Sequence, residues 1–77
     1  MKLGKYRHFK GNLYEVVGVS RSSEKPTDKF VVYRSLYEGE YPYGQLWIRP
    51  FEMFNETIEQ DGKIVKRFEY ADNEGEL

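Results

Sequence analysis

The 77-residue sequence contains no cysteine, a single histidine, a single tryptophan and no long hydrophobic run. Without cysteine the chain can form neither disulfides nor a thiolate metal site. No apolar run approaches the ~20 residues that a membrane-spanning helix requires. The charged segment Met1–Lys5 is not followed by the apolar stretch of a signal peptide. We therefore expect a cytoplasmic protein that does not cross a membrane.

The motifs of common enzyme classes are also lacking. The sequence has no glycine-rich phosphate loop, no His/Asp/Glu cluster at metal-ligand spacing and no serine in a nucleophile elbow. His8 could act as a general base, but an exposed strand residue beside Arg7 is the simpler interpretation. Glu38 and Glu40 are better explained as solvated loop charges than as a cation site. Because a catalytic nucleophile or base needs a second polar group to support it, we predict no enzymatic activity and no cofactor.

Charge is unevenly distributed, although the net charge is only −1. Residues 1–37 contain eight basic and three acidic side chains, a balance of +5, whereas residues 38–77 contain four basic and ten acidic ones, a balance of −6. Either the two halves attract each other, within one chain or between copies, or the N-terminal strands carry a basic face.

Short runs of β-branched and aromatic residues, separated by turn residues, predict an all-β domain. The runs 30–37 and 46–49 flank a Gly- and Pro-containing connection, which predicts a β-hairpin. Further strands are predicted over residues 6–9, 13–19, 57–60 and 63–68, and the turn pair Asp61-Gly62 joins the last two. Gly18 marks a predicted bulge or bend, and Pro50 begins a predicted helical turn that ends at Phe54.

Five to six short strands with one helical turn and no long helix indicate a small SH3-like barrel or roll. We predict one domain over residues 1–70 and an acidic, frayed tail over residues 71–77. The 13 aromatic side chains are the main material for the core. Both faces of residues 30–37 are largely apolar, so alternation leaves open which face is buried.

Several segments resemble one known family. They are Gly4-Lys5-Tyr6-Arg7-His8-Phe9-Lys10-Gly11-Asn12-x-Tyr14, Val31-Val32-Tyr33-Arg34-x-Leu36-Tyr37, Leu46-Trp47-Ile48-Arg49-Pro50, Met53-Phe54 and Arg67-Phe68. Over roughly residues 4–70 the chain resembles the bacterial domain-of-unknown-function family DUF1653. The resemblance implies an SH3-like β-roll in a small bacterial protein, and it implies no function. The loop Glu38–Gly44 is longer than the usual link of that family.

Basic and aromatic residues alternate along the predicted strands. Such mixtures hold single-stranded nucleic acid, because bases stack on aromatic rings while guanidinium groups meet phosphates. The candidate ligand-binding residues are Tyr6, Arg7, His8, Tyr33, Arg34, Trp47, Arg49 and Arg67. Arg34, Arg49 and Arg67 would meet phosphate, whereas Trp47, Tyr33 and Tyr6 would stack. Neighbouring strand residues point to opposite faces, so Trp47 and Arg49 share a face while Tyr33 and Arg34 do not.

Three other interpretations remain open. The same aromatics could form the core, with the arginines paired to carboxylates such as Glu15. A peptide partner could bind a groove of the kind found in SH3-like domains, lined by Tyr37, Tyr41, Pro42, Tyr43, Trp47 and Pro50. Glu38 and Glu40 would then select a basic ligand. Finally, edge strands and exposed aromatics could form a homo-oligomer.

Overall fold

The computed structural model describes residues 1–72 and contains, within that range, seven strands and one short helix. The elements are β1 (Gly4–His8), β2 (Leu13–Arg21), β3 (Lys29–Ser35), β4 (Leu46–Pro50), α1 (Phe51–Phe54), β5 (Thr57–Gln60), β6 (Lys63–Lys66) and β7 (Phe68–Tyr70). The predicted all-β class is thus confirmed. No helix of the described chain is long and apolar enough to span a membrane.

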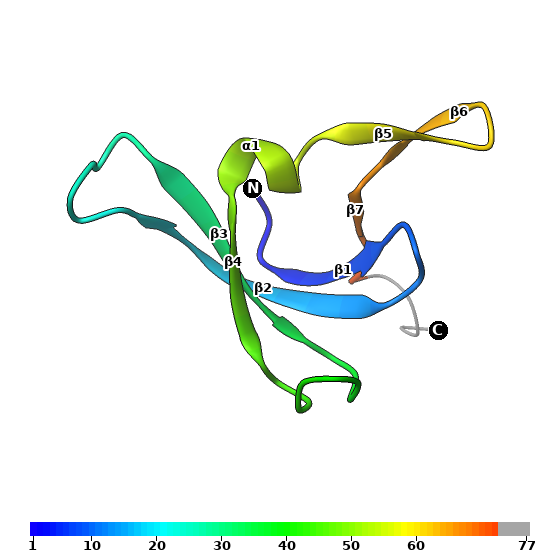
Figure 1. The fold of residues 1–77 in the computed structure, drawn as a ribbon, viewed down its shortest axis with the longest axis horizontal. Coiled ribbons are helices and arrows are strands. Elements are labelled where there is room, and N and C mark those ends of the chain that lie inside the picture. The colour runs from blue at the N-terminus through cyan, green and yellow to red at the C-terminus, as the bar shows by residue number, and fades with distance from the viewer. Residues whose placement is uncertain (73–77) are drawn as a thin grey trace.

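Five strands form one antiparallel sheet in the order β4-β3-β2-β1-β7, and β5 and β6 form a separate hairpin (Figure 1). Of the predicted barrel or roll, the described residues do not form a closed barrel, because β4 and β7 remain the two edges of an open sheet. An SH3-like arrangement of the strands stays a prediction. The register of β2 against β3 shifts between Val16 and Gly18, which confirms the predicted bulge beside Gly18.

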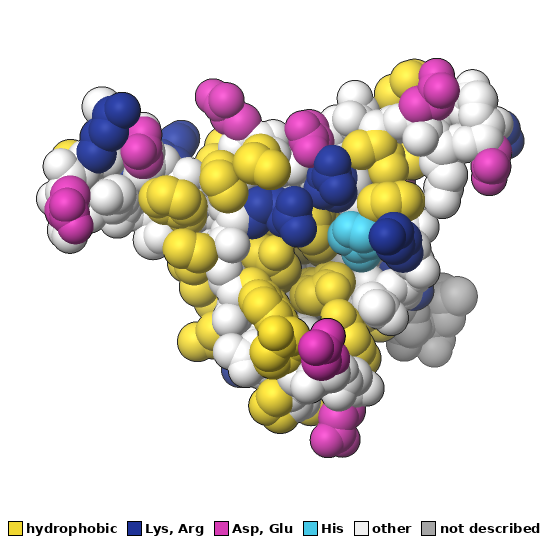
Figure 2. Space-filling view, viewed as in Figure 1, with side chains coloured by type: hydrophobic (Ala, Val, Ile, Leu, Met, Phe, Trp, Pro, Cys, Tyr) yellow, Lys and Arg dark blue, Asp and Glu magenta, His cyan; other side chains and the backbone are white. Residues whose placement is uncertain are grey.

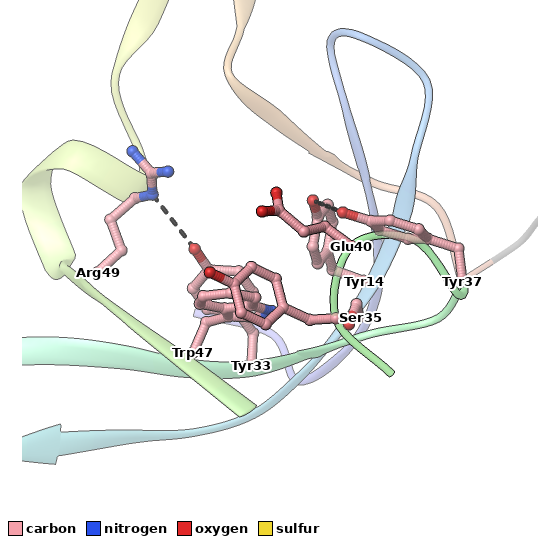
Figure 3. Close-up of a pocket in the computed structure, with 8 residues that line it drawn as sticks. Tyr14, Tyr33, Ser35, Tyr37, Glu40, Trp47 and Arg49 are labelled. Atoms are coloured by element: carbon pink, nitrogen blue, oxygen red, sulfur yellow. Dashed lines mark hydrogen bonds between the residues drawn. The ribbon is translucent and has the colours of Figure 1, made fainter. Parts of the chain in front are cut away.

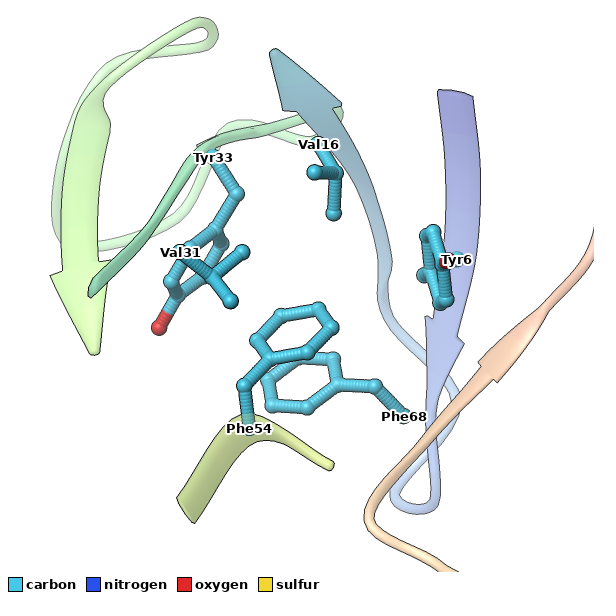
Figure 4. Close-up of a cluster of buried hydrophobic side chains, with 6 residues drawn as sticks. All are labelled: Tyr6, Val16, Val31, Tyr33, Phe54 and Phe68. Atoms are coloured by element: carbon cyan, nitrogen blue, oxygen red, sulfur yellow. The ribbon is translucent and has the colours of Figure 1, made fainter. Parts of the chain in front are cut away.

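The face of β3 that alternation left open is now defined. Val31, Tyr33 and Ser35 are buried on the inner face, whereas Phe30 and Val32 on the outer face are half-buried. The inner face of the sheet supports a core of Tyr6, Val16, Val31, Tyr33, Phe54 and Phe68 (Figure 4).

Helix α1 covers this core by inserting Phe54. The rings of Phe54 and Phe68 stack at a centroid distance of 4.1 Å, and the rings of Tyr6 and Tyr33 meet Phe54 edge-on. Pro50 ends β4 and caps the helix, so the predicted helical turn is confirmed one residue later than expected. One aromatic side chain on a four-residue helix therefore closes one end of the inner face.

The chain leaves the β5–β6 hairpin at Arg67. Asp61 and Gly62 both have positive φ, as a type I′ turn requires, so the predicted turn is confirmed. The predicted strand 63–68 is interrupted, because the Arg67 amide donates to the Glu56 carbonyl while its own carbonyl accepts from the Phe9 amide. Arg67 thus links the hairpin to β1, beside which β7 then runs.

The packed chain extends past the predicted boundary at residue 70. Ala71 is buried, and its amide donates to the Lys5 carbonyl at 2.8 Å. The Asp72 carboxylate accepts from the Lys5 amide and from the Tyr70 hydroxyl. Residues 71 and 72 therefore belong to the folded unit rather than to the expected tail, while residues 73–77 lie outside the described range.

Candidate functional site

The uncovered end of the inner face forms a pocket of about 310 Å³ (Figure 3). Strands β2, β3 and β4 supply its floor, and the connection between β3 and β4 supplies one wall. The lining residues are Tyr14, Tyr33, Ser35, Tyr37, Glu40, Tyr41, Trp47 and Arg49. Five of the eight lining residues are therefore aromatic.

The aromatic walls are held by strand register and by the loop backbone. Trp47 lies opposite Tyr33 across the β3–β4 pairing, so both rings are on the inner face. Tyr41 meets Trp47 edge-on at 5.0 Å between ring centroids. The Gly44 amide donates to the Ser35 carbonyl and the Gln45 amide donates to the Pro42 carbonyl, which folds the loop back toward the sheet. The Trp47–Tyr41 pair leaves Tyr41 half exposed at the mouth of the pocket.

Two tyrosine hydroxyls form the far wall. Tyr14 and Tyr37 share a hydrogen bond of 2.8 Å between their hydroxyl oxygens. Burial raises the pKa of Tyr14 well above its ordinary value, and the hydrogen bond with Tyr37 raises it further. Tyr14 thus remains a neutral phenol at physiological pH.

Arg49 occupies the opposite side of the pocket (Figure 3). Its Nε donates a long hydrogen bond of 3.4 Å to the Tyr33 hydroxyl, and its guanidinium lies 5.6 Å from the Phe68 ring centroid. Within residues 1–72 no carboxylate forms an ion pair with Arg49. The guanidinium is therefore positioned by neutral and aromatic groups and keeps its charge available.

His8 lies among several cations, one of which is Arg49. Burial lowers the pKa of His8 below its ordinary value, and the positive charges of Arg49, Arg67 and Lys10 lower it further. The Lys10 amide also donates to Nδ1 of His8 at 3.2 Å, which favours the neutral ring. Figure 2 shows Lys and Arg side chains gathered around the histidine on this face. We call Arg49, Arg67, Lys10 and His8 the basic cluster.

One member of the basic cluster is partly neutralised. Nε and Nη2 of Arg67 both donate to Oε1 of Glu56, at 3.0 and 2.6 Å. This ion pair fixes the guanidinium above the inner face and leaves Arg49 as the cation that borders the pocket directly.

The structure brings together five of the eight predicted ligand-binding residues and separates the other three. His8, Tyr33, Trp47, Arg49 and Arg67 lie in or beside the pocket. Arg34 lies on the outer face, where its Nε meets Glu15 at 3.0 Å. Arg7 alternates with Tyr6 and His8 along β1 and points away from the inner face. Tyr6 lies in the core and does not line the pocket.

The pocket also contains residues that the nucleic-acid hypothesis did not include. Tyr14 was missed, although its shared face with Val16 was visible as strand alternation. Glu40, Tyr37 and Tyr41 had been assigned to a peptide groove. The other residues of that groove, Tyr43, Pro42 and Pro50, do not line this pocket. The two sets of candidates therefore converge on one site, because the loop folds over β3 and β4.

Comparison with known proteins establishes the family. The profile of DUF1653, described as a protein of unknown function, matches residues 4–70. The chain belongs to the DUF1653 family. A crystal structure of a DUF1653 protein from Bordetella bronchiseptica is similar, with 32% sequence identity and a TM-score of 0.79 over 92% of this chain and 87% of that chain. No curated protein matches the sequence.

Membership of DUF1653 confirms the family predicted from the sequence and adds no activity to the site. Within residues 1–72, no three His, Asp or Glu side chains lie close enough to hold a metal ion. The function of this DUF1653 protein must accordingly be argued from the aromatic pocket and the basic cluster.

Proposed function

We propose that this protein is a small binding module that holds one nucleotide, either free or exposed in a single strand. The base would enter the aromatic pocket and the phosphate would lie against the basic cluster. One observation carries this proposal: Arg49 belongs to both the pocket and the cluster, so the two surfaces are continuous.

The pocket suits one flat ring system. Its volume of about 310 Å³ is at the small end of the ~300–1,000 Å³ typical of ligand sites. Trp47 and Tyr41 offer aromatic surface near the mouth, and base–aromatic stacking contributes ~1–3 kcal/mol per base. A base that is paired and stacked in a duplex cannot enter such a pocket, which favours an unpaired nucleotide.

The basic cluster suits the phosphate. Arg49 lacks a carboxylate partner in the described chain, and its guanidinium can form paired hydrogen bonds to phosphate oxygens. Arg67 and Lys10 add positive charge around His8, whose own ring is neutral at physiological pH. The set of residues proposed to meet phosphate and base differs from the set predicted from the sequence, since Arg34 and Tyr6 have no access to the pocket.

A peptide with a basic side chain is the alternative ligand. Glu40 lies among tyrosines, and cations bind to aromatic faces beside carboxylates. Arg49 at the other side of the same pocket disfavours a cation and favours an anion. The nucleotide therefore accounts for Arg49 and the basic cluster, which a basic peptide does not.

Two tyrosines of the β3–β4 loop provide a matched test. Tyr41 lines the pocket, whereas Tyr43 is 63% exposed and does not. We expect Tyr41→Ala to weaken binding of a fluorescently labelled single-stranded oligonucleotide by ~1–3 kcal/mol, because a stacking surface is lost. Tyr43→Ala should bind as the wild type does. Fluorescence anisotropy measures both affinities, and circular dichroism checks that both variants are folded.

Equal affinities for the two variants would contradict the assignment of the base to this pocket. An oligonucleotide that fails to bind the wild type, together with binding of a lysine-rich peptide that Tyr41→Ala abolishes, would replace the nucleotide by the peptide ligand.

A further inference from the structure

The carboxylate of Glu40 has no role in the binding of a phosphate, yet it lies in the pocket. Figure 3 shows it pointing into the pocket from the side opposite Arg49. Among residues 1–72 it has no hydrogen-bond donor or cation as partner. The backbone around it is held in a turn, since the Gly39 amide donates to the Tyr41 carbonyl at 3.2 Å. The pocket therefore presents one anionic hydrogen-bond acceptor beside its aromatic side chains, on the side opposite Arg49.

The two charged groups would orient a bound nucleotide. Phosphate is repelled by Glu40 and attracted by Arg49 and the rest of the basic cluster. The base would accordingly point its far edge toward Glu40 while its ring lies between the aromatic side chains. The hydrogen-bond donors that a base presents to Glu40 then decide which base binds most tightly.

An ionised carboxylate accepts hydrogen bonds and cannot donate them. The Watson–Crick edge of guanine presents two adjacent donors, N1–H and the N2 amino group, which match the two carboxylate oxygens. Adenine and cytosine place an acceptor nitrogen beside their amino group, and uracil flanks its N3–H with two carbonyls. Guanine is therefore the one common base that can form two hydrogen bonds with Glu40 without placing an acceptor against it.

We propose that Glu40 makes this site selective for guanine. The inference rests on the proposed nucleotide-binding function and names the base that the site prefers. The ligand is a guanine nucleotide, either free or within a single strand, because both present the same edge.

Glu40→Gln tests the selectivity, and Glu38→Gln is the matched control. Both changes remove one carboxylate from the same loop, but Glu38 does not line the pocket. The probes are GMP, IMP and AMP, titrated by isothermal calorimetry into the wild type and both variants. IMP keeps N1–H and lacks the N2 amino group, so it isolates one of the two hydrogen bonds. A guanine-containing and an adenine-containing tetranucleotide separate free nucleotide from single strand as the source.

We expect the wild type to prefer GMP over AMP by roughly tenfold or more, as is usual for paired hydrogen bonds to a base edge, with IMP between them. Glu40→Gln should lose most of this preference and bind AMP at least as well as the wild type does. Glu38→Gln should keep the preference.

The outcomes distinguish the two proposals. Nucleotides that bind without base preference, or a preference that survives Glu40→Gln, would overturn the selectivity and leave nucleotide binding intact. The absence of binding for every nucleotide and tetranucleotide would overturn the proposed function itself.

Discussion

His8 is a titratable residue whose surroundings differ between the unfolded and the folded chain. In the unfolded state its pKa is the ordinary value near 6.5. In the folded state burial lowers the pKa, and the charges of Arg49, Arg67 and Lys10 act in the same direction. Between the two pKa values the unfolded chain binds the proton more readily than the folded chain does, so this residue destabilises the fold as the pH decreases.

We therefore predict that the free energy of unfolding falls as the pH is lowered through 6.5. The contribution of His8 is absent above neutral pH, and it levels off once the pH is below the folded pKa. Urea denaturation of the wild type and of His8→Gln, at several pH values from 8 to 5, isolates this contribution. The difference between the two proteins should change with pH below 6.5. A difference that stays constant would show that His8 titrates normally in the fold.

Strand alternation predicted which single residues share a face, and packing decided which face is inside. Trp47 and Arg49 were correctly expected on one face. Tyr33 and Arg34 were correctly expected on opposite faces, but the burial of Tyr33 and the exposure of Arg34 follow from where Phe54 packs. No local pattern carries that information, because residues 30–37 are apolar on both sides.

At the scale of elements, the packing of residues 71 and 72 against β1 depends on the absence of a side chain at Gly4. Gly4 has φ of +117°, and a Cβ at this position would collide with the Asp72 carboxylate that accepts from the Lys5 amide. Gly18, in the bulge of β2, has ordinary φ and open space around it. The two glycines therefore differ in whether an alanine can replace them.

We expect Gly4→Ala to lower the free energy of unfolding by ~1–3 kcal/mol, because an alanine at positive φ is strained and displaces Asp72. Gly18→Ala should change it by less than ~1 kcal/mol. Thermal denaturation compares the two variants with the wild type. If both variants changed the free energy of unfolding by the same small amount, the result would contradict the packing of residues 71 and 72 against β1.

Elements defined by local chemistry were predicted well. The Asp61-Gly62 turn, the helical turn after Pro50 and the bulge near Gly18 each depend on a few adjacent residues, and all three are present. The break at Arg67 and the packing of Ala71 were not predicted, since both depend on pairing with β1 at the other end of the chain. The pocket was not predicted as one site either, because its residues come from the three strands β2, β3 and β4 and from the loop between β3 and β4.

At the scale of the whole molecule, the two faces of the sheet have different characters. The inner face carries the core, the pocket and the basic cluster. The outer face carries Leu46 and Ile48 on the edge strand β4, and Ile48 is 64% exposed. Self-association through this edge stays a prediction of the sequence.

Substituting Arg49 or Arg34 by glutamine removes one positive charge from the inner or the outer face of the sheet, respectively, so the two variants can be compared directly. Arg49 borders the pocket, and Arg34 lies on the outer face with Glu15. If phosphate binds at the basic cluster, Arg49→Gln should remove one phosphate contact and Arg34→Gln none. Each phosphate contact to a single strand contributes a slope of about −0.7 to the dependence of log K on log salt concentration.

The most direct test uses Trp47, the only tryptophan of the chain and a lining residue of the pocket. Its emission is titrated with a short single-stranded oligonucleotide at several salt concentrations in the wild type, Arg49→Gln and Arg34→Gln. We predict quenching in the wild type, a salt slope reduced by ~0.7 in Arg49→Gln, and an unchanged slope in Arg34→Gln. Emission that does not respond to the oligonucleotide, or equal slopes in the two variants, would contradict a nucleotide site in this pocket.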